Sequence, residues 1–124
     1  MNMVRTISVH GYEALTKALS GIQGSVYILF SGSQDEYGVS WCPDCVKAEP
    51  VINKNLEKAP SDATFIHCHV GDRNYWKKQD NEFRKDPKFL VKCVPTLLKF
   101  GSPQRLEEEQ LFKDDLIQMM FEED

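Results

Sequence analysis

The chain of 124 residues lacks any apolar run approaching the roughly 20 residues of a membrane-spanning helix. It also lacks a surplus of basic residues, because the formal net charge is -4 and no excess of cations exists to neutralise nucleic-acid phosphates or an anionic membrane. The first residues lack the apolar stretch of a secretory signal. We therefore expect a cytosolic protein that binds neither nucleic acid nor membrane.

Cysteine is scarce, and its four residues do not form a zinc-binding pattern. Only Cys42 and Cys45 have ligand spacing; there is no second C-x-x-C and no H-x-x-x-H pair to complete four ligands. His67 and His69 would share one strand face, but a third ligand is missing beside them. We expect no metal, although a zinc site built on the cysteine pair and an inert structural pair remain alternatives.

What the sequence does contain is the run Cys42-Pro43-Asp44-Cys45. Two cysteines separated by two residues can close into a disulfide and reopen to a dithiol. Structural disulfides are rare in the cytosol, so a pair expected there favours redox chemistry. The motif is short, and its meaning depends on the elements around it.

Hydrophobic periodicity predicts one α/β domain over residues 1–124. Strands are expected over 4–9, 25–31, 63–70, 94–100 and 105–108, and helices over 11–22, 43 to about 58, 75–85 and 111–121. The run 25–31 is nearly all apolar, which is typical of a central strand covered on both faces. In the second helix, Val46, Val51, Ile52 and Leu56 are the expected buried positions, and Pro50 is expected to kink it.

Cys42 lies where a polar loop meets the start of the helix expected from residue 43. Pro43 suits the first helical position, and the sulfur of Cys42 would then face unpaired N–H groups and the positive end of the helix dipole. Both favour the thiolate, which is the nucleophile. Cys45 lies one turn further in and is expected to be more buried, which suits a resolving role. Asp44 stabilises the helix start but disfavours a nearby thiolate, so its net effect stays open.

Further residues around this motif carry a family resemblance. Trp41-Cys42-x-x-Cys45, Pro50 eight positions after Cys42, and Val94-Pro95-Thr96 before a strand resemble the thioredoxin superfamily over almost the whole chain. The chain is most similar to a branch of small cytosolic thioredoxin-related proteins. That closer similarity is carried by Gly32-Ser33, the extended loop to Ser40, the run Ser40 to Cys45, Ala48-Glu49-Pro50, Tyr75-Trp76-Lys77 and Phe83-Arg84-Lys85.

The resemblance implies a thioredoxin fold, with a central mixed sheet flanked by helices on both faces. It implies a cis peptide bond before Pro95, and substrate pairing with the backbone of Val94. Trp41, Pro43 and Asp44 would tune the pair or contact substrate. The implied activity is a monomeric disulfide reductase with no bound cofactor, receiving electrons from NADPH through thioredoxin reductase. Its implied substrates are small disulfides such as cystine and accessible protein disulfides, with weak peroxidase activity besides.

Two features depart from ordinary thioredoxins. Leu29 occupies the position at which the resemblance implies a buried Asp, so the proton acceptor for Cys45 is open, with Asp44 or water as candidates. The loop from Gly32 to Ser40 is longer and is expected to crowd the rim of the site. Bulky protein disulfides are therefore expected to be poorer substrates. Cys93, two residues before Pro95, is either an incidental small residue or a regulatory thiol, and Cys68 is expected in the core.

A second function class also fits these residues. The same scaffold can present a peptide groove around Val94 and Pro95 to a signalling partner, with the cysteine pair modulating the binding. Replacing both cysteines by serine separates the two hypotheses, because binding would survive and turnover would not.

Overall fold

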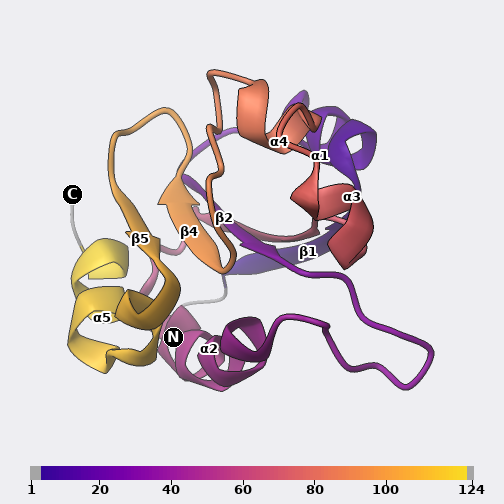
Figure 1. Cartoon of the computed structure of the whole chain (residues 1–124). Coiled ribbons are helices and arrows are strands. Elements are labelled where there is room, and N and C mark those ends of the chain that lie inside the picture. Colours follow the sequence, from indigo (N-terminus) through magenta and orange to yellow (C-terminus); the bar gives the residue numbers. More distant parts are fainter. Residues whose placement is uncertain (1–3, 123–124) are drawn as a thin grey trace.

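A computed structural model describes residues 4–122 as a five-stranded sheet between two layers of helices (Figure 1). The strand order is β1-β3-β2-β4-β5. The bounds are β1 (Arg5–His10), β2 (Val26–Ser31), β3 (Thr64–His69), β4 (Thr96–Lys99) and β5 (Arg105–Glu107). The pairs β1–β3 and β3–β2 are parallel, whereas β2–β4 and β4–β5 are antiparallel. The predicted mixed sheet is confirmed.

Helices cover both faces of this sheet, as predicted (Figure 1). One layer contains α1 (Tyr12–Leu19), α3 (Arg73–Lys77) and α4 (Glu82–Lys85). The other contains α2 (Pro43–Asn55), α5 (Asp114–Glu122) and the short 3-10 turns η1 (Leu56–Lys58) and η2 (Glu108–Phe112). Within residues 4–122, no helix is long and apolar enough to cross a membrane.

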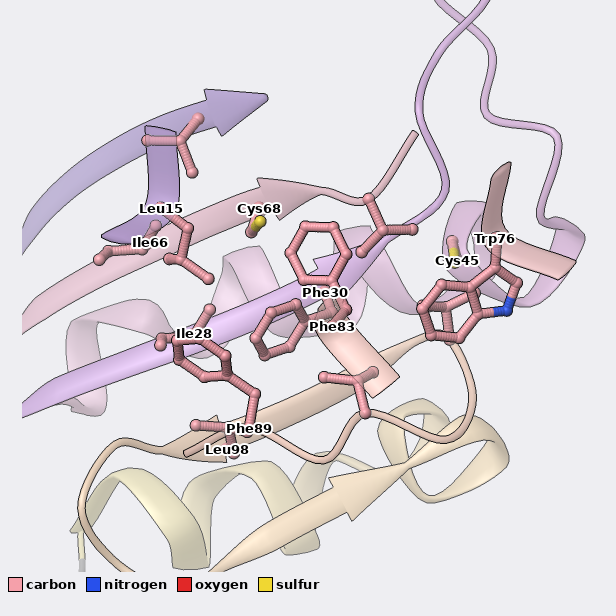
Figure 2. Close-up of a cluster of buried hydrophobic side chains, with 14 of the residues drawn as sticks. Leu15, Ile28, Phe30, Cys45, Ile66, Cys68, Trp76, Phe83, Phe89 and Leu98 are labelled. Atoms are coloured by element: carbon pink, nitrogen blue, oxygen red, sulfur yellow. The ribbon is translucent and has the colours of Figure 1, made fainter. Parts of the chain in front are cut away.

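Strand β2 lies at the centre of the molecule, and all six of its residues are buried. Its side chains alternate between the two faces, so Ile28 and Phe30 enter one apolar cluster while Tyr27 and Leu29 enter the other. Figure 2 shows the first cluster, in which Phe30 meets Phe83 edge-on with ring centroids 5.8 Å apart. Burial on both faces explains why this strand reads as a continuous apolar run.

Strands β1, β3 and β2 end at the same edge of the sheet, because they are parallel. From the end of β2 the chain extends away from the body before it returns to start α2 (Figure 1). This edge therefore receives the loop, the start of α2 and the ends of three strands, which is where sites form in open α/β sheets.

The structure corrects two details of the helices. The helix predicted over 75–85 is two short helices, because Asp72 caps α3 by accepting from the Tyr75 N–H at 2.8 Å and Asn81 caps α4 by accepting from the Arg84 N–H at 3.1 Å. The helix predicted over 111–121 begins only at Asp114, and η2 precedes it.

The prediction that Val46 is buried is wrong. Val46 is 47% exposed, because the buried face of α2 is formed by Cys45, Ala48 and Ile52, at spacings of three and four residues, and Val46 lies outside that face. The same helix continues through Pro50 to Asn55.

Candidate active site

The cysteine pair lies at the N-terminus of α2. Cys42 is the residue before the helix, with extended backbone angles, and Pro43 occupies the first turn, as predicted. The Cys42 sulfur accepts a hydrogen bond from the backbone N–H of Cys45 at 3.1 Å. The two cysteines are joined as a disulfide, with their Cα atoms 5.2 Å apart. The helix N-terminus thus directs a donor at the sulfur of Cys42, which favours the thiolate when the pair is reduced.

Burial does not distinguish the two cysteines, since each is 5% exposed. The prediction that Cys45 is the more buried is wrong, because neighbouring segments cover Cys42 as well as Cys45. Their surroundings differ instead. Cys42 lines an open groove, whereas Cys45 lines a smaller cavity on the other side of the pair.

The segment Val94-Pro95 lies against the pair. Its peptide bond is cis, which confirms the prediction. The Cys42 Sγ atom lies 3.6 Å from the carbonyl oxygen of Val94. Val94 lines the groove beside Cys42, and Pro95 lines the cavity beside Cys45. A segment 52 residues away in the sequence thereby lies against the sulfur of Cys42, which we expect to react.

The groove around Cys42 has a volume of about 450 Å³. It is lined by Trp41, Cys42, Pro43, Asp44, Trp76, Lys92, Cys93, Val94 and Glu108. Five of the seven predicted site residues are in that set, and the other two, Cys45 and Pro95, line the cavity behind it. Sequence reasoning missed Lys92 and Glu108 because no local pattern marks them, and only the fold brings them to the pair. Trp76 is buried, with 7% exposure, and is also part of the groove.

Trp41 is held in a fixed orientation. Its Nε1–H donates to the carbonyl of Gly71 at 2.8 Å. The Arg73 guanidinium lies 5.5 Å from its ring centroid and donates to the Trp41 carbonyl at 3.1 Å. Gly32 lies directly against the indole, so that a Cβ atom there would come within 2.6 Å of it. The ring therefore forms a preorganised wall of the groove.

The extended loop after β2 is closed on itself. The Asp35 carboxylate accepts from the N–H groups of Tyr37 and Val39 at 2.8 and 3.1 Å. At its base, Ser40 donates to the Gly32 carbonyl at 2.7 Å and accepts from the Cys42 N–H at 3.1 Å. The contacts at the base of the loop therefore fix Cys42, the residue from which α2 starts.

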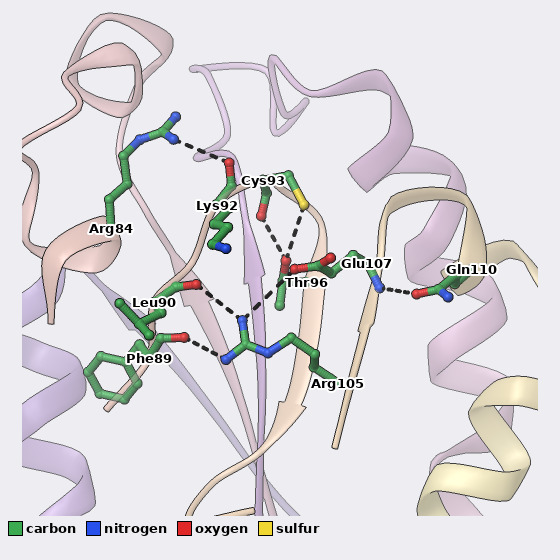
Figure 3. A network of polar contacts seen from close by, with 9 residues as sticks. All are labelled: Arg84, Phe89, Leu90, Lys92, Cys93, Thr96, Arg105, Glu107 and Gln110. Atoms are coloured by element: carbon green, nitrogen blue, oxygen red, sulfur yellow. Dashed lines mark hydrogen bonds and ion pairs between the residues drawn. The ribbon is translucent and has the colours of Figure 1, made fainter. Parts of the chain in front are cut away.

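Two arginines hold the chain that leads to Pro95 (Figure 3). Arg105, on β5, donates to the carbonyls of Phe89 and Leu90 at 2.7 and 3.2 Å. Arg84, on α4, donates to the carbonyl of Lys92 at 3.2 Å and stacks on Trp76 at 4.1 Å from the ring centroid. Backbone carbonyls that no strand pairs are satisfied in this way, and the segment before Val94 is fixed.

The two remaining cysteines have different environments. Cys68 is fully buried in β3, as predicted, and burial raises the pKa of its thiol to about 12. Cys93 is half-buried in the groove, 3.7 Å from the Thr96 hydroxyl, and burial raises its pKa more than that contact lowers it. Among the residues from 4 to 122, no cluster of three or more His, Cys, Asp or Glu side chains is placed to hold a metal ion.

Comparisons with known proteins agree with this geometry. The family described as "Thioredoxin domain-containing protein 17-like, thioredoxin domain" matches residues 8–123. The chain is 51% identical to thioredoxin domain-containing protein 17 of Danio rerio over 100% of both chains, and 47% identical to that of Mus musculus over 95% of each. A solved structure of a mutant thioredoxin from Halobacterium salinarum NRC-1 shares the fold, with a TM-score of 0.56 and 22% identity over 98% of this chain and 92% of that one.

Proposed function

The chain belongs to the thioredoxin domain-containing protein 17-like family, and from this membership we propose that it is a thiol–disulfide oxidoreductase that reduces small and accessible disulfides. One observation carries the proposal. Cys42 and Cys45 are joined at the start of α2, with the Cys42 sulfur accepting a backbone N–H and facing the cis Val94-Pro95 segment.

The reaction proceeds in two exchanges. The Cys42 thiolate attacks one sulfur of the substrate disulfide, forming a mixed disulfide and releasing the other sulfur as a thiolate. Cys45 then attacks the Cys42 sulfur, so that the Cys42–Cys45 bond forms and the bond to the substrate breaks. The substrate gains two electrons and the pair loses them. Cys42 is assigned the first attack because it lines the open groove, whereas Cys45 lines the cavity behind the pair.

The groove supports the proposed substrates. Its walls combine the Trp41 indole with the backbone of Val94, which suits an extended disulfide-bearing chain or a compact molecule such as cystine. We assign Trp41, Pro43 and Asp44 to contact and tuning, and Val94 and Pro95 to substrate alignment.

Recycling requires an electron donor, for which we propose NADPH acting through thioredoxin reductase in the cytosol. No bound cofactor is needed for the exchanges themselves, and we propose that the protein works as a monomer. Weak peroxidase activity would follow from the same Cys42 thiolate.

A binding role is the second candidate, and the observation that favours it is the pair of charged residues in the lining of the groove. The groove extends past the pair to Lys92 and Glu108, which offer a cation and an anion to a peptide. Binding at these residues would survive replacement of both cysteines by serine, whereas reduction would not.

The proposal is tested by single-turnover reduction of cystine by the reduced protein, followed by recycling with NADPH and thioredoxin reductase. Cys42→Ser is expected to abolish both, and Cys45→Ser to stop at a trapped mixed disulfide. Cys93→Ser is the matched control and retains turnover, since the chemistry needs only the pair. Absence of cystine reduction by the wild-type protein would overturn the reductase assignment, and failure to be recycled would remove the proposed electron source.

A further inference from the structure

The sheet face covered by α2 changes from apolar to polar where the parallel strands end. On β2, Leu29 is followed on this face by Ser31, and on β3, Phe65 is followed by His67 and His69. The register places Leu29 beside His67 and Ser31 beside His69. A polar corner therefore lies at the strand ends, next to the start of α2.

A cavity of about 120 Å³ lies between this polar corner, the first turns of α2 and the loop after β2. Cys45 lines it together with Leu29, Ser31, Glu49, His67 and His69. The cavity has room for a few water molecules, since each occupies about 30 Å³ in the liquid. The side of the pair away from the groove thus faces a small polar space and not a sealed core.

His67 connects this cavity to solvent. Its Nε2 atom lies 2.5 Å from the Ser31 hydroxyl, and its Nδ1 atom lies 3.6 Å from a carboxylate oxygen of Glu49. The Glu49 side chain is 41% exposed, whereas that of His67 is 19% exposed. In the tautomer that accepts from the Ser31 hydroxyl at Nε2, the proton of the ring is on Nδ1, on the side of the Glu49 carboxylate, so the imidazole lies between a hydrogen-bonded hydroxyl and a nearby carboxylate.

The groups around His67 keep it neutral at physiological pH. Burial, and then the charge of His10 on β1, lower the pKa of His67 to about 4. The pKa of His69 is likewise lowered to about 4 by burial and by the two other histidines, with Glu49 acting in the opposite direction. His10 stacks on His69, whose ring centroid lies 4.3 Å from that of His67. The imidazoles are therefore neutral at physiological pH, and a proton taken up by His67 would be held only briefly before it is passed on.

The Nδ1 atom of His69 is a second indication of polar chemistry in the cavity. His69 is 5% exposed, and its Nδ1 is buried without a hydrogen-bond partner among residues 4–122. A buried nitrogen of this kind is normally satisfied by water. The cavity therefore suits hydrogen-bonded water that reaches from Cys45 to the histidines.

Building on the proposed disulfide reduction, we propose that His67 is the acceptor for the proton that Cys45 releases in the second exchange. The Cys45 proton passes through cavity water and the Ser31 hydroxyl to His67 Nε2, while the Cys45 sulfur attacks Cys42. The Cys42–Cys45 bond forms, the Cys42–substrate bond breaks, and the substrate sulfur leaves with its electron pair and takes a proton from solvent. His67 then returns its proton to solvent through the half-exposed Glu49.

This assignment replaces Asp44 as the candidate acceptor. Asp44 lines the groove on the Cys42 side and an acidic hollow with Glu107, Glu108 and Glu109, and it does not line the cavity that contains Cys45. Leu29 lies in the cavity wall but has no polar atom to accept a proton. His67 instead reaches the cavity from the neighbouring strand.

The test uses an aromatic disulfide whose thiol product is coloured, mixed rapidly with the reduced protein in a Cys93→Ser background. The first exchange releases one equivalent of thiol and the second exchange releases another. Cys45→Ser, which stops after the first equivalent, identifies the phases. His67→Phe keeps an aromatic ring but removes both nitrogens. We expect its first phase to be unchanged and its second phase to slow by about 10²-fold at pH 6, the lower range for general base catalysis.

The pH profile separates a proton acceptor from a merely structural residue. The defect of His67→Phe should shrink as the pH rises, because the Cys45 thiol then loses its proton increasingly without help from a base. His10→Phe is the control for loss of a neighbouring imidazole, because His10 is exposed and does not line the cavity. Its second phase should not be slowed, since the loss of the His10 charge removes a cause that lowers the pKa of His67 and leaves the acceptor in place. A His67→Phe second phase that is unchanged, or slowed equally at every pH, would falsify the assignment.

Chemical rescue gives an independent readout if the bulkier ring disturbs folding. His67→Ala should show the same slow second phase, and added imidazole should restore it in proportion to its concentration. No restoration would refute the role of the ring as acceptor. The background protein separates this inference from the proposed function: if it releases no second equivalent, the dithiol mechanism fails, whereas a normal second phase with no His67 effect removes only the proton acceptor.

Discussion

At the scale of single residues, Gly32 is the point at which the wall of the groove is packed most tightly. A Cβ atom at this position would lie 2.6 Å from Cε2 of Trp41. The indole cannot retreat without loss, because Gly71 and Arg73 hold it from the other side. We expect Gly32→Ala to lower the free energy of unfolding by about 1–3 kcal/mol, as overpacking does, and to slow cystine reduction.

Urea denaturation and single-turnover kinetics measure the two effects of Gly32→Ala. Gly21→Ala is the matched control, because no heavy atom lies within 4 Å of the Cβ atom it would add. Its stability should stay within about 0.5 kcal/mol of the wild type, as for other surface substitutions. Equal stabilities for the two variants would show that the indole moves aside at no cost.

At the scale of the elements, the segment before Pro95 depends on an arginine from another strand. Arg105 holds the carbonyls of Phe89 and Leu90, and Leu90 has a positive φ of 45°. Arg105→Met keeps much of the aliphatic stem and removes the donors. We expect a loss of about 1–2 kcal/mol in the free energy of unfolding, in line with hydrogen bonds to charged groups.

The same Arg105→Met variant should exchange its amide hydrogens faster in residues 89–94 than the wild type, and its KM for cystine should rise. Hydrogen-exchange mass spectrometry and steady-state kinetics measure these changes. Arg5→Met on the exposed part of β1 is the control and should leave both unchanged. Unaltered exchange over residues 89–94 in Arg105→Met would mean that the segment is fixed by packing alone.

The extended loop after β2 leads to a prediction about selectivity. Tyr37 in this loop is 82% exposed, and the loop extends from the body of the molecule between β2 and α2 (Figure 1). Replacing residues 34–39 by a short thioredoxin-like connection should raise the rate on a folded protein disulfide, because a bulky substrate then meets less obstruction. The rate on cystine, which is small, serves as the internal control. An unchanged ratio of the two rates would remove the loop as a selectivity filter.

Some residues and elements of this protein can be predicted from the sequence, and others cannot. Cys42, Pro43 and Pro95 are predictable because motif and family resemblance fix their places, and β2 because burial on both faces makes it continuously apolar. Val46 is misplaced because an apolar residue near a helix start does not show which way the helix is rotated against the sheet. His67 is missed as part of the site because its neighbours, Ser31 and Glu49, come from β2 and α2. Only the register of the sheet and the packing of α2 bring them together.

For the whole molecule, the buried histidines make stability depend on pH. The pKa values of His67 and His69 are about 4 in the folded protein and 6.5 in the ordinary, exposed state. Between these values the unfolded chain binds more protons than the folded one. Stability is therefore fully present above about pH 6.5 and is lost as the pH falls toward 4. The expected loss is about 3 kcal/mol for each of the two histidines between pH 7 and pH 4.

Urea denaturation at a series of pH values measures this loss. In His69→Gln, a neutral amide replaces a buried base, so the slope of stability against pH should be reduced between pH 7 and pH 4. His10→Gln should reduce the slope less than His69→Gln does, since His10 is exposed and only adds to the shifts that burial causes at His67 and His69. The same slope of stability against pH in the wild type and both variants would show that the buried histidines do not cause the pH dependence.

Because Cys68 is buried more completely than the other cysteines, the number of alkylated thiols indicates both the redox state and the folding of the chain. An alkylating reagent should not reach Cys68 in the folded protein, because this residue is fully buried and its thiol is hardly ionised at neutral pH. The folded, oxidised chain is therefore labelled at Cys93, reduction adds a label at Cys42, which lines the open groove, and Cys68 is labelled only on unfolding. A single intact-mass spectrum thus reads redox state and folding separately, in lysate or in cells, with no reporter fused to the protein.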